Sequence, residues 1–173
     1  MTPTLHEQFM TIALVQARAA LDNGEFPVGC VITDGKTVLA SGARNGSRTD
    51  SRVFFADETT HAEMLALKNL TASNNPIDRR ILTIYSTLEP CLMCFGAILI
   101  HGIDTIVYAC EDAMGGGTGC DLSTLPGLYH HRNLSIIPGV LREKSLSLLK
   151  AFFNNPENRY LQASPLAAYI LEQ

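Results

Sequence analysis

Apolar residues recur at helical spacing near the start of the chain, over residues 3–24. The large side chains in this pattern are Leu5, Phe9, Ile12 and Leu21, and the small residues Ala13 and Ala20 share the same face. Such spacing is typical of an amphipathic helix that covers a core with one face. The sequence therefore predicts an N-terminal helix with these residues on its apolar face.

The pattern then changes from helical to strand-like. Two β-rich runs around an Asp-Gly pair indicate a hairpin over residues 28–42. Residues 42–59 are polar and aperiodic, which predicts a long loop of a kind that is often functional. Beyond it, helices are expected over 61–70, 91–102 and 141–153, strands over 81–87, 104–110 and 134–139, and a last helical turn or two within 165–173.

The order of these elements predicts the fold class. After the hairpin, strands alternate with helices, so the later strands are expected to pair in parallel. The result is an α/β fold: a three-layer α/β/α sandwich around a central mixed five-stranded sheet. A chain of 173 residues suits a single domain over 1–173, with a core at 5–153 and a C-terminal extension at 154–173.

Composition and charge limit the classes of protein to which the chain can belong. The chain is 46 % apolar and 17 % charged, and its net charge of −4 gives no global attraction to nucleic acid. Arg44, Arg48 and Arg52 form a small basic cluster, read most simply as a solvated loop. No run predicts a membrane span, and the N-terminus does not resemble a signal peptide, so a cytoplasmic protein without a membrane partner is expected. Five cysteines without an export signal argue against a disulfide framework.

Candidate chemistry lies at the predicted starts of two helices. Cys91 and Cys94 begin one, and His61 and Glu63 begin another. The 29 residues between His61 and Cys91 hold one helix and one strand, which can bring both helix N-termini to one edge of the sheet. A helix N-terminus stabilises thiolates. One imidazole and two thiolates with an open fourth position indicate a catalytic zinc, beside which Glu63 is a candidate general acid/base.

Three other interpretations of Cys91 and Cys94 remain open at this stage. They are a redox pair, two buried core residues, or half of a structural zinc site. A redox pair leaves His61 and Glu63 unexplained, and a structural site gives the carboxylate no role. Candidate fourth ligands for a structural zinc are Cys120, His101, His130 and His131.

The segments HAE at 61–63 and PCLMC at 90–94 together resemble the cytidine/deoxycytidylate deaminase superfamily of zinc enzymes. Residues 26–153 look closest to the branch that contains the bacterial tRNA-specific adenosine deaminases. The resemblance implies a cytidine-deaminase-like α/β/α fold and a homodimer. It also implies hydrolytic deamination, in which the amino group of a nucleobase becomes an oxo group and ammonia is released.

The resemblance also implies roles for individual residues. One Zn²⁺ per chain would be held by His61, Cys91 and Cys94, and Glu63 would shuttle the proton. Contacts with the base would come from Asn45, Val28, Ala62 and Pro90.

The substrate is left open by departures from that branch. Its tRNA-acting members usually end in a basic run, whereas residues 152–173 carry only Arg159. Phe54 and Phe55 are candidates for base stacking or for a dimer contact, and the bulk of Phe95 is a candidate for narrowing the pocket. His130 and His131 are candidates for a pocket or for exposed loop residues. A base in a tRNA anticodon loop is therefore one expectation, a free base or nucleoside of guanine, cytosine or adenine type is the second, and a non-catalytic zinc-binding partner subunit is the outside alternative.

Overall fold

The sheet begins with the predicted hairpin. The computed structural model describes residues 2–48, 57–73, 78–130 and 132–173. In it, β1 (Gly29–Thr33) and β2 (Val38–Ala43) pair antiparallel. The turn is held by Asp34, whose Oδ1 accepts the backbone N–H groups of Lys36 at 2.9 Å and Thr37 at 2.7 Å. This is the local chemistry that an Asp-Gly hairpin requires.

Three further strands complete the sheet, in the order β2-β1-β3-β4-β5. β3 (Thr83–Leu88) is antiparallel to β1, whereas β4 (Thr105–Cys110) and β5 (Ser135–Ile137) continue from it in parallel. The mixed five-stranded sheet is therefore confirmed, and it is open.

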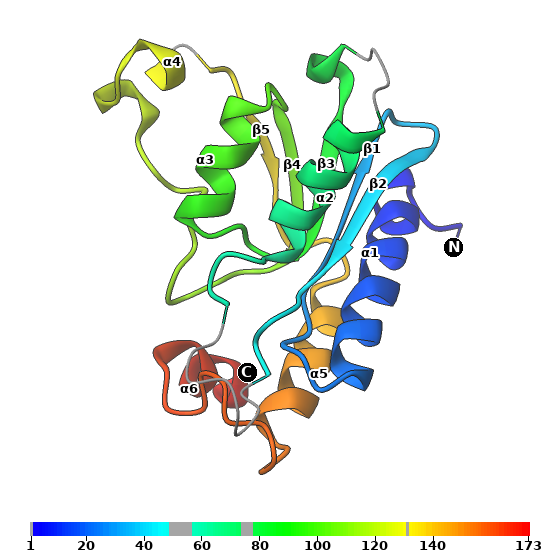
Figure 1. Ribbon diagram of the computed structural model, residues 1–173, viewed down its shortest axis with the longest axis vertical. Helices are drawn as coiled ribbons and strands as arrows, with labels where there is room; N and C mark the ends of the chain where they lie inside the picture. Colours follow the sequence, from blue (N-terminus) through cyan, green and yellow to red (C-terminus); the bar gives the residue numbers. More distant parts are fainter. Residues whose placement is uncertain (1, 49–56, 74–77, 131) are drawn as a thin grey trace.

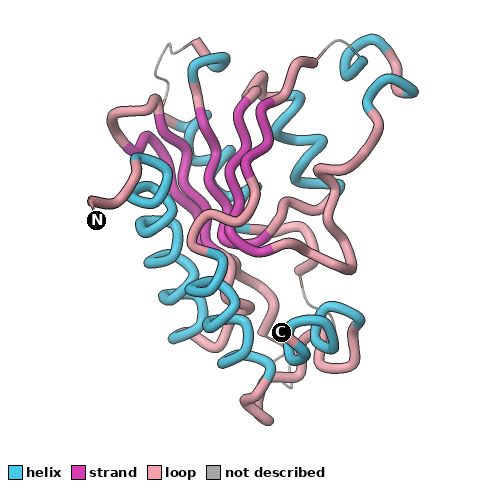
Figure 2. Tube along the Cα trace, turned by 180° about the vertical axis from the view of Figure 1, so that it is seen from behind, coloured by secondary structure: helices cyan, strands magenta, loops and turns pink. Residues whose placement is uncertain are grey.

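Helices cover both faces of this sheet. Figures 1 and 2 show α1 (Leu5–Asp22) and α5 (Arg142–Phe153) on one face, with α2 (Ala62–Ala72) and α3 (Leu92–Ile100) on the other. The remaining helical elements are η1 (Arg79–Ile81), η2 (Leu122–Thr124), α4 (Gly127–His130) and α6 (Pro165–Glu172). Among the described helices, none combines the length and apolar character that a membrane crossing needs.

Strand residues divide between two apolar clusters. Val31, Tyr85 and Val107 pack with α1. Their strand neighbours Ile32, Ile84 and Ile106 belong to the other cluster and pack toward α2 and α3. Because successive side chains point to opposite faces, a strand buried on both faces is apolar almost throughout. The three-layer α/β/α sandwich is confirmed by this arrangement.

The inner face of α1 differs from the predicted one. Phe9 and Ala13 are buried as predicted, but Leu5 and Ile12 are 50 % and 39 % exposed. Ala17, which was not predicted, is fully buried. The reason lies in Gly29 of β1, where a Cβ would lie 2.2 Å from the Ala13 carbonyl oxygen. Helix and strand backbones approach so closely that only small side chains fit between them.

The C-terminal extension is packed into the core. Leu166, Ala167 and Ile170 of α6 are buried in the cluster that lies under α2 and α3. Arg142 at the start of α5 forms an ion pair with Glu111, and its Nη2 also donates to Gln173 Oε1 of the extension at 2.9 Å. The extension is therefore tied to the sheet by apolar contacts and by its position next to α5.

The position of α2 depends on Gly42 of β2. A Cβ at Gly42 would lie 2.2 Å from the Ala62 carbonyl oxygen and 2.8 Å from the Ala66 backbone nitrogen. The helix therefore rests directly on the strand backbone at its first turn, next to His61.

Gly42→Ala is expected to destabilise the protein by about 2 kcal/mol or more, because a side chain here must push the first turn of α2 off the sheet. Chemical denaturation measures this. The matched control is Gly96→Ala in α3, where a Cβ meets nothing within 4 Å. That variant is expected to be as stable as the parent or more so, because alanine is the better helix former. Equal stability of both variants would contradict the close approach.

Candidate metal centre

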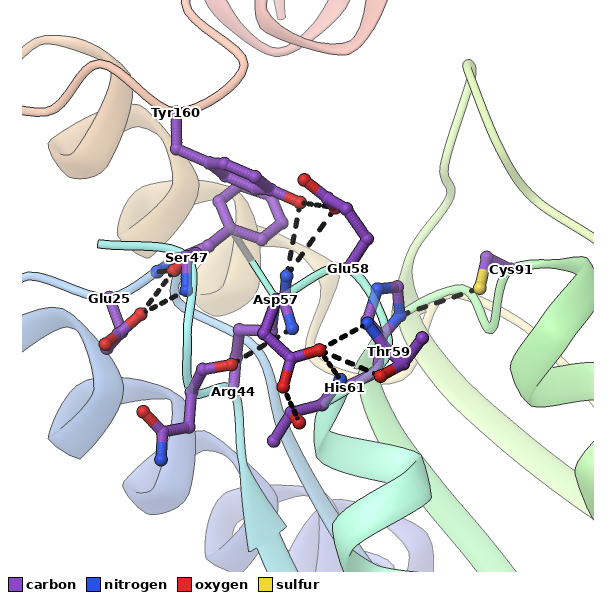
Figure 3. A network of polar contacts seen from close by, with 12 residues as sticks. Glu25, Arg44, Ser47, Asp57, Glu58, Thr59, His61, Cys91 and Tyr160 are labelled. Carbon is purple, nitrogen blue, oxygen red and sulfur yellow. Dashed lines mark hydrogen bonds and ion pairs between the residues drawn. The ribbon is translucent and has the colours of Figure 1, made fainter. Parts of the chain in front are cut away.

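Two helices begin at the same edge of the sheet. His61 is the N-cap residue of α2 and Cys91 is the N-cap residue of α3. Neither side chain forms a capping hydrogen bond with its own helix. The two side chains instead face each other, as Figure 3 shows for the imidazole and the thiol. The predicted convergence of the two N-termini is therefore observed.

The three predicted ligands form one compact group. His61 Nδ1 lies 3.6 Å from Cys91 Sγ and 3.5 Å from Cys94 Sγ. The three donor atoms lie within 4.8 Å of one another. A nitrogen at ~2.0 Å and a sulfur at ~2.3 Å from one tetrahedral ion would be about 3.5 Å apart. Both the donor chemistry and the spacing fit zinc.

The electrostatics of the group favour a thiolate. Hydrogen bonds from the Cys94 thiol and from His61 lower the pKa of Cys91 to about 4. The contact with Cys91 also raises the pKa of the His61 imidazole. Hydrogen bonding to Cys91 and burial raise the pKa of Cys94. A divalent ion bound to the group would favour the ionised form of both thiols.

Glu63 stands beside this group in the first turn of α2. Its side chain is buried, and burial is the main reason why its pKa is raised. Ser86 Oγ donates to Glu63 Oε1 at 2.8 Å, while Oε2 lies 3.5 Å from Cys94 Sγ. One carboxyl oxygen is therefore anchored to β3, and the other faces the metal ligands.

His61, Glu63 and Cys91 border a partly open cavity of about 180 Å³. It is smaller than the pockets that hold drug-sized ligands and suits a single flat ring system. The surface of its walls is mainly apolar, with Phe26, Val28, Leu88, Leu161 and Leu166 in the lining. The polar lining residues include Arg44, Glu58, His61, Glu63, Glu89, Asp112 and Tyr160.

The predicted base contacts do not all reach this cavity. Val28 and Ala62 line it. Pro90 is buried outside the lining, and its carbonyl oxygen accepts the Gly117 N–H at 2.9 Å. Asn45 is exposed and does not line the cavity either. A contact between the base and the Asn45 side chain thus stays a prediction.

Arg44, Glu58 and Tyr160 are among the lining residues that sequence reasoning missed. Arg44, expected in a solvated loop, is 3 % exposed and borders the cavity. Glu58 and Tyr160 line it as well. Among these three residues, only Arg44 had a signal in the sequence, because it is next to Asn45, a predicted base contact. Glu58 and Tyr160 lie in stretches without periodicity.

The remaining aromatic and histidine candidates lie elsewhere. Phe95 is 2 % exposed, packs in the core and does not line the cavity. Phe54, Phe55 and His131 fall outside the described residues. Across the described part of the chain, no histidine, cysteine or carboxylate joins His61 and the two cysteines as a fourth ligand, and both cysteines are free thiols. The redox and structural-zinc interpretations therefore gain no support.

A zinc-dependent hydrolase holds a borderline-soft metal ion next to an acid/base group. The three donor residues and the buried carboxyl group of Glu63 fit this arrangement. The sequence of residues 3–110 matches the family model described as the cytidine and deoxycytidylate deaminase zinc-binding region. The chain belongs to this family of deaminases.

Individual relatives agree with this assignment. The chain is 34 % identical to tRNA-specific adenosine deaminase 2 of Xenopus laevis over 125 residues, which cover 68 % of this chain and 67 % of the relative. It is 39 % identical to the tRNA-specific adenosine deaminase of Haemophilus influenzae over 117 residues, covering 65 % and 62 %. The matched region spans only 9 % of the chloroplastic tRNA(adenine(34)) deaminase of Arabidopsis thaliana.

Solved structures share the fold. One from a study of A-to-I editing by tRNA:A34 deaminases has a TM-score of 0.67 at 28 % identity and covers 82 % of this chain and 99 % of that one. A guanine deaminase from Nitrosomonas europaea has a TM-score of 0.62 at 24 % identity, covering 84 % and 83 %. The second likeness concerns the fold alone.

Cys94→Ala is expected to reduce bound zinc from about one ion per chain to almost none, because it removes one of three protein ligands. Metal analysis after dialysis measures this. Cys120→Ala is the matched control and should keep its zinc, since Cys120 is exposed and lies outside the ligand group. Equal zinc content in the two variants would contradict the assigned ligand set.

Proposed function

We propose that this protein deaminates adenine within a tRNA anticodon loop, converting adenosine to inosine. The observation that carries the proposal is the buried carboxyl group of Glu63, which lines the same cavity as His61 and Cys91 of the three-residue ligand group. The tRNA-specific adenosine deaminases among the relatives support the choice of base and of tRNA.

The proposed reaction replaces the amino group of the base with oxygen from water and releases ammonia. Zinc, when bound by His61, Cys91 and Cys94, supplies a Lewis acid that makes water a nucleophile at neutral pH. Glu63 is the proposed proton carrier. Its Oε2 takes one proton from the attacking water and gives it to the adjacent ring nitrogen, and it then carries the second water proton to the leaving amine, which departs as ammonia.

The chain prepares this proton transfer in two ways. The Ser86 hydroxyl holds Oε1 of Glu63, so that only Oε2 is left to face the substrate. Burial raises the pKa of Glu63, which makes the carboxyl group better able to hold a proton between the two transfers. The apolar walls at Val28 and Leu88 exclude bulk water and place the base in the cavity.

A free base or nucleoside is the second candidate substrate. The small volume of the cavity favours it, because Tyr160, Leu161 and Leu166 of the C-terminal extension close one side. The acidic balance of the chain favours it too, since RNA binding depends on cationic side chains. A non-catalytic zinc-binding subunit is the outside alternative, which the presence of a buried Glu63 disfavours.

A substrate panel tests these candidates. It contains a tRNA anticodon stem-loop, adenosine, adenine, guanine and cytosine, each assayed for ammonia release at low and moderate salt. The proposal expects turnover of the stem-loop that weakens as salt rises. Turnover of free bases alone would favour the second candidate. No turnover of any member by zinc-loaded protein would support the non-catalytic alternative.

Glu63→Gln is expected to lower kcat by about 10²–10⁴-fold, the usual contribution of a general acid/base. Zinc content should stay unchanged because the ligands are intact. Glu172→Gln, on the exposed end of α6, is the matched control and should retain full activity. Undiminished turnover by the Glu63 variant would exclude this carboxyl group as the proton carrier.

We also propose that the protein is a homodimer. A groove between α3 and η2 is lined by Leu92 and Leu125, which are 64 % and 39 % exposed. Leu128 of α4 is also exposed, at 66 %. Exposed apolar side chains gathered in this way are typical of a protein–protein contact, and the family resemblance implies a second copy of the chain. A cytoplasmic location stays a prediction from the sequence.

Sedimentation velocity tests the dimer. The parent protein is expected to sediment with the mass of two chains, and Leu125→Glu should shift it toward one chain by placing a charge in the contact. Val15→Glu on α1 is the matched control, because Val15 is 59 % exposed on the opposite face of the sheet. A parent protein that sediments as a single chain would sink the proposal.

A further inference from the structure

Arg44 places a buried positive charge in the wall of the cavity. It directly follows β2, and its side chain is only 2 % exposed. Among the described residues that line the cavity, it is the one lysine or arginine. Its Nη1 donates to the carbonyl oxygen of Asn45 at 3.1 Å, which directs the rest of the guanidinium toward the cavity side of the loop.

Two polar side chains from distant segments meet Arg44. Arg44 Nη2 lies 3.3 Å from Tyr160 Oη and 3.7 Å from Glu58 Oε2. Tyr160 Oη in turn donates to Glu58 Oε2 at 2.7 Å. Figure 3 shows these three residues gathered on one side of His61, with Cys91 on the other side. We call Arg44, Glu58 and Tyr160 the rim cluster.

The fold fixes the tyrosine in this place. The Tyr160 ring packs against Phe26, with ring centroids 5.7 Å apart, and lies 5.6 Å from the Arg44 guanidinium carbon. The next residue, Leu161, has a φ of 56°, which costs free energy for a residue with a Cβ. Strained backbone of this kind is common where a chain is shaped around a ligand.

The rim cluster lies where the cavity meets solvent. Glu58 is 64 % exposed, while Glu63 and Arg44 on the same cavity are buried. A cavity of about 180 Å³ can enclose a base but little more. With the reacting carbon of the base near Glu63, whatever the base is attached to must leave through the open side of the cavity, whose exposed lining residues are Glu58 of the rim cluster and Met114.

The cluster matches the chemistry of a sugar. Each ribose hydroxyl is both a donor and an acceptor, and the 2′-hydroxyl is the group by which proteins distinguish RNA from DNA. A carboxylate such as Glu58 accepts from these hydroxyls, as acidic residues do for the ribose of dinucleotides. Arg44 donates, and the Tyr160 hydroxyl does either. A carboxylate and a guanidinium held 3.7 Å apart leave hydrogen-bonding capacity on both.

We propose that Arg44, Glu58 and Tyr160 form a ribose subsite, through which the enzyme selects ribonucleosides over 2′-deoxyribonucleosides and free bases. This deepens the proposed deaminase function and rests on it. The ribose belongs either to a free nucleoside or to a nucleotide within RNA, and the hydroxyl chemistry is the same in both.

The first test measures binding, so that it does not depend on turnover. Zinc-loaded Glu63→Gln protein is titrated with adenosine, 2′-deoxyadenosine and adenine, and with a stem-loop that carries either a ribose or a 2′-deoxyribose at the target adenosine. Adenosine, the ribo stem-loop or both are expected to bind about tenfold more tightly than the deoxy counterpart, the effect of one hydrogen bond to a charged group. The arm that shows the preference identifies the source of the ribose.

The second test removes the subsite. Tyr160→Phe and Glu58→Gln, each in the same background, are expected to reduce the tenfold ribo preference to less than about threefold and to leave the deoxy ligand almost unaffected. Tyr129→Phe and Glu157→Gln are the matched controls, since neither residue lines the cavity, and should keep the preference. If the rim cluster only holds the C-terminal extension in place, the two substitutions would lower the melting temperature and would weaken the binding of ribo and deoxy ligands equally.

The outcomes separate the two proposals. Equal binding of ribo and deoxy ligands by the parent protein overturns the ribose subsite, as does a ribo preference that survives both substitutions. Tight binding of adenine with no gain from its sugar also overturns it. A ribo preference that depends on Tyr160 and Glu58, in a protein that releases no ammonia from any substrate, supports the subsite and rejects the deaminase proposal.

Discussion

His61, Cys91 and Cys94 can share one ion only if two helix N-termini lie within a few ångströms of each other. Most of the fold can be understood from this constraint. β3 leads into α3 and so places Cys91 at the end of the strand, while the backbone contact at Gly42 lets α2 bring His61 to the same edge. The helix dipoles then favour the anionic ligands that a divalent metal requires. The β1–β2 hairpin packs against α1 at Gly29 and gives the metal ligands a rigid support.

The parts that could be predicted from sequence are those with a short-range signal. The ligand set follows from two compact motifs and from the single helix and strand between them. Asn45 and Arg44 show where such reasoning ends. Neighbouring side chains along an extended segment point in opposite directions, so only one of Asn45 and Arg44 can enter the cavity. Composition and spacing do not show which one does. The packing of Arg44 against Tyr160 shows that it is Arg44.

Chemistry and substrate selection come from different parts of the chain. The family model matches residues 3–110, which include every proposed metal ligand and Glu63. Tyr160, Leu161 and Leu166 close the cavity and lie beyond that region. Family resemblance therefore bears on the reaction more than on the molecule that undergoes it. The contact between Tyr160 and Arg44 also joins segments without periodicity that are far apart in sequence, which is why the sequence offered no signal for it.

The late position of Tyr160 has a consequence for how the enzyme matures on the ribosome. The segments that carry the metal ligands are synthesised before the segment with Tyr160, Leu161 and Leu166. The side of the cavity that these three residues form is therefore added to a ligand group whose residues are already present.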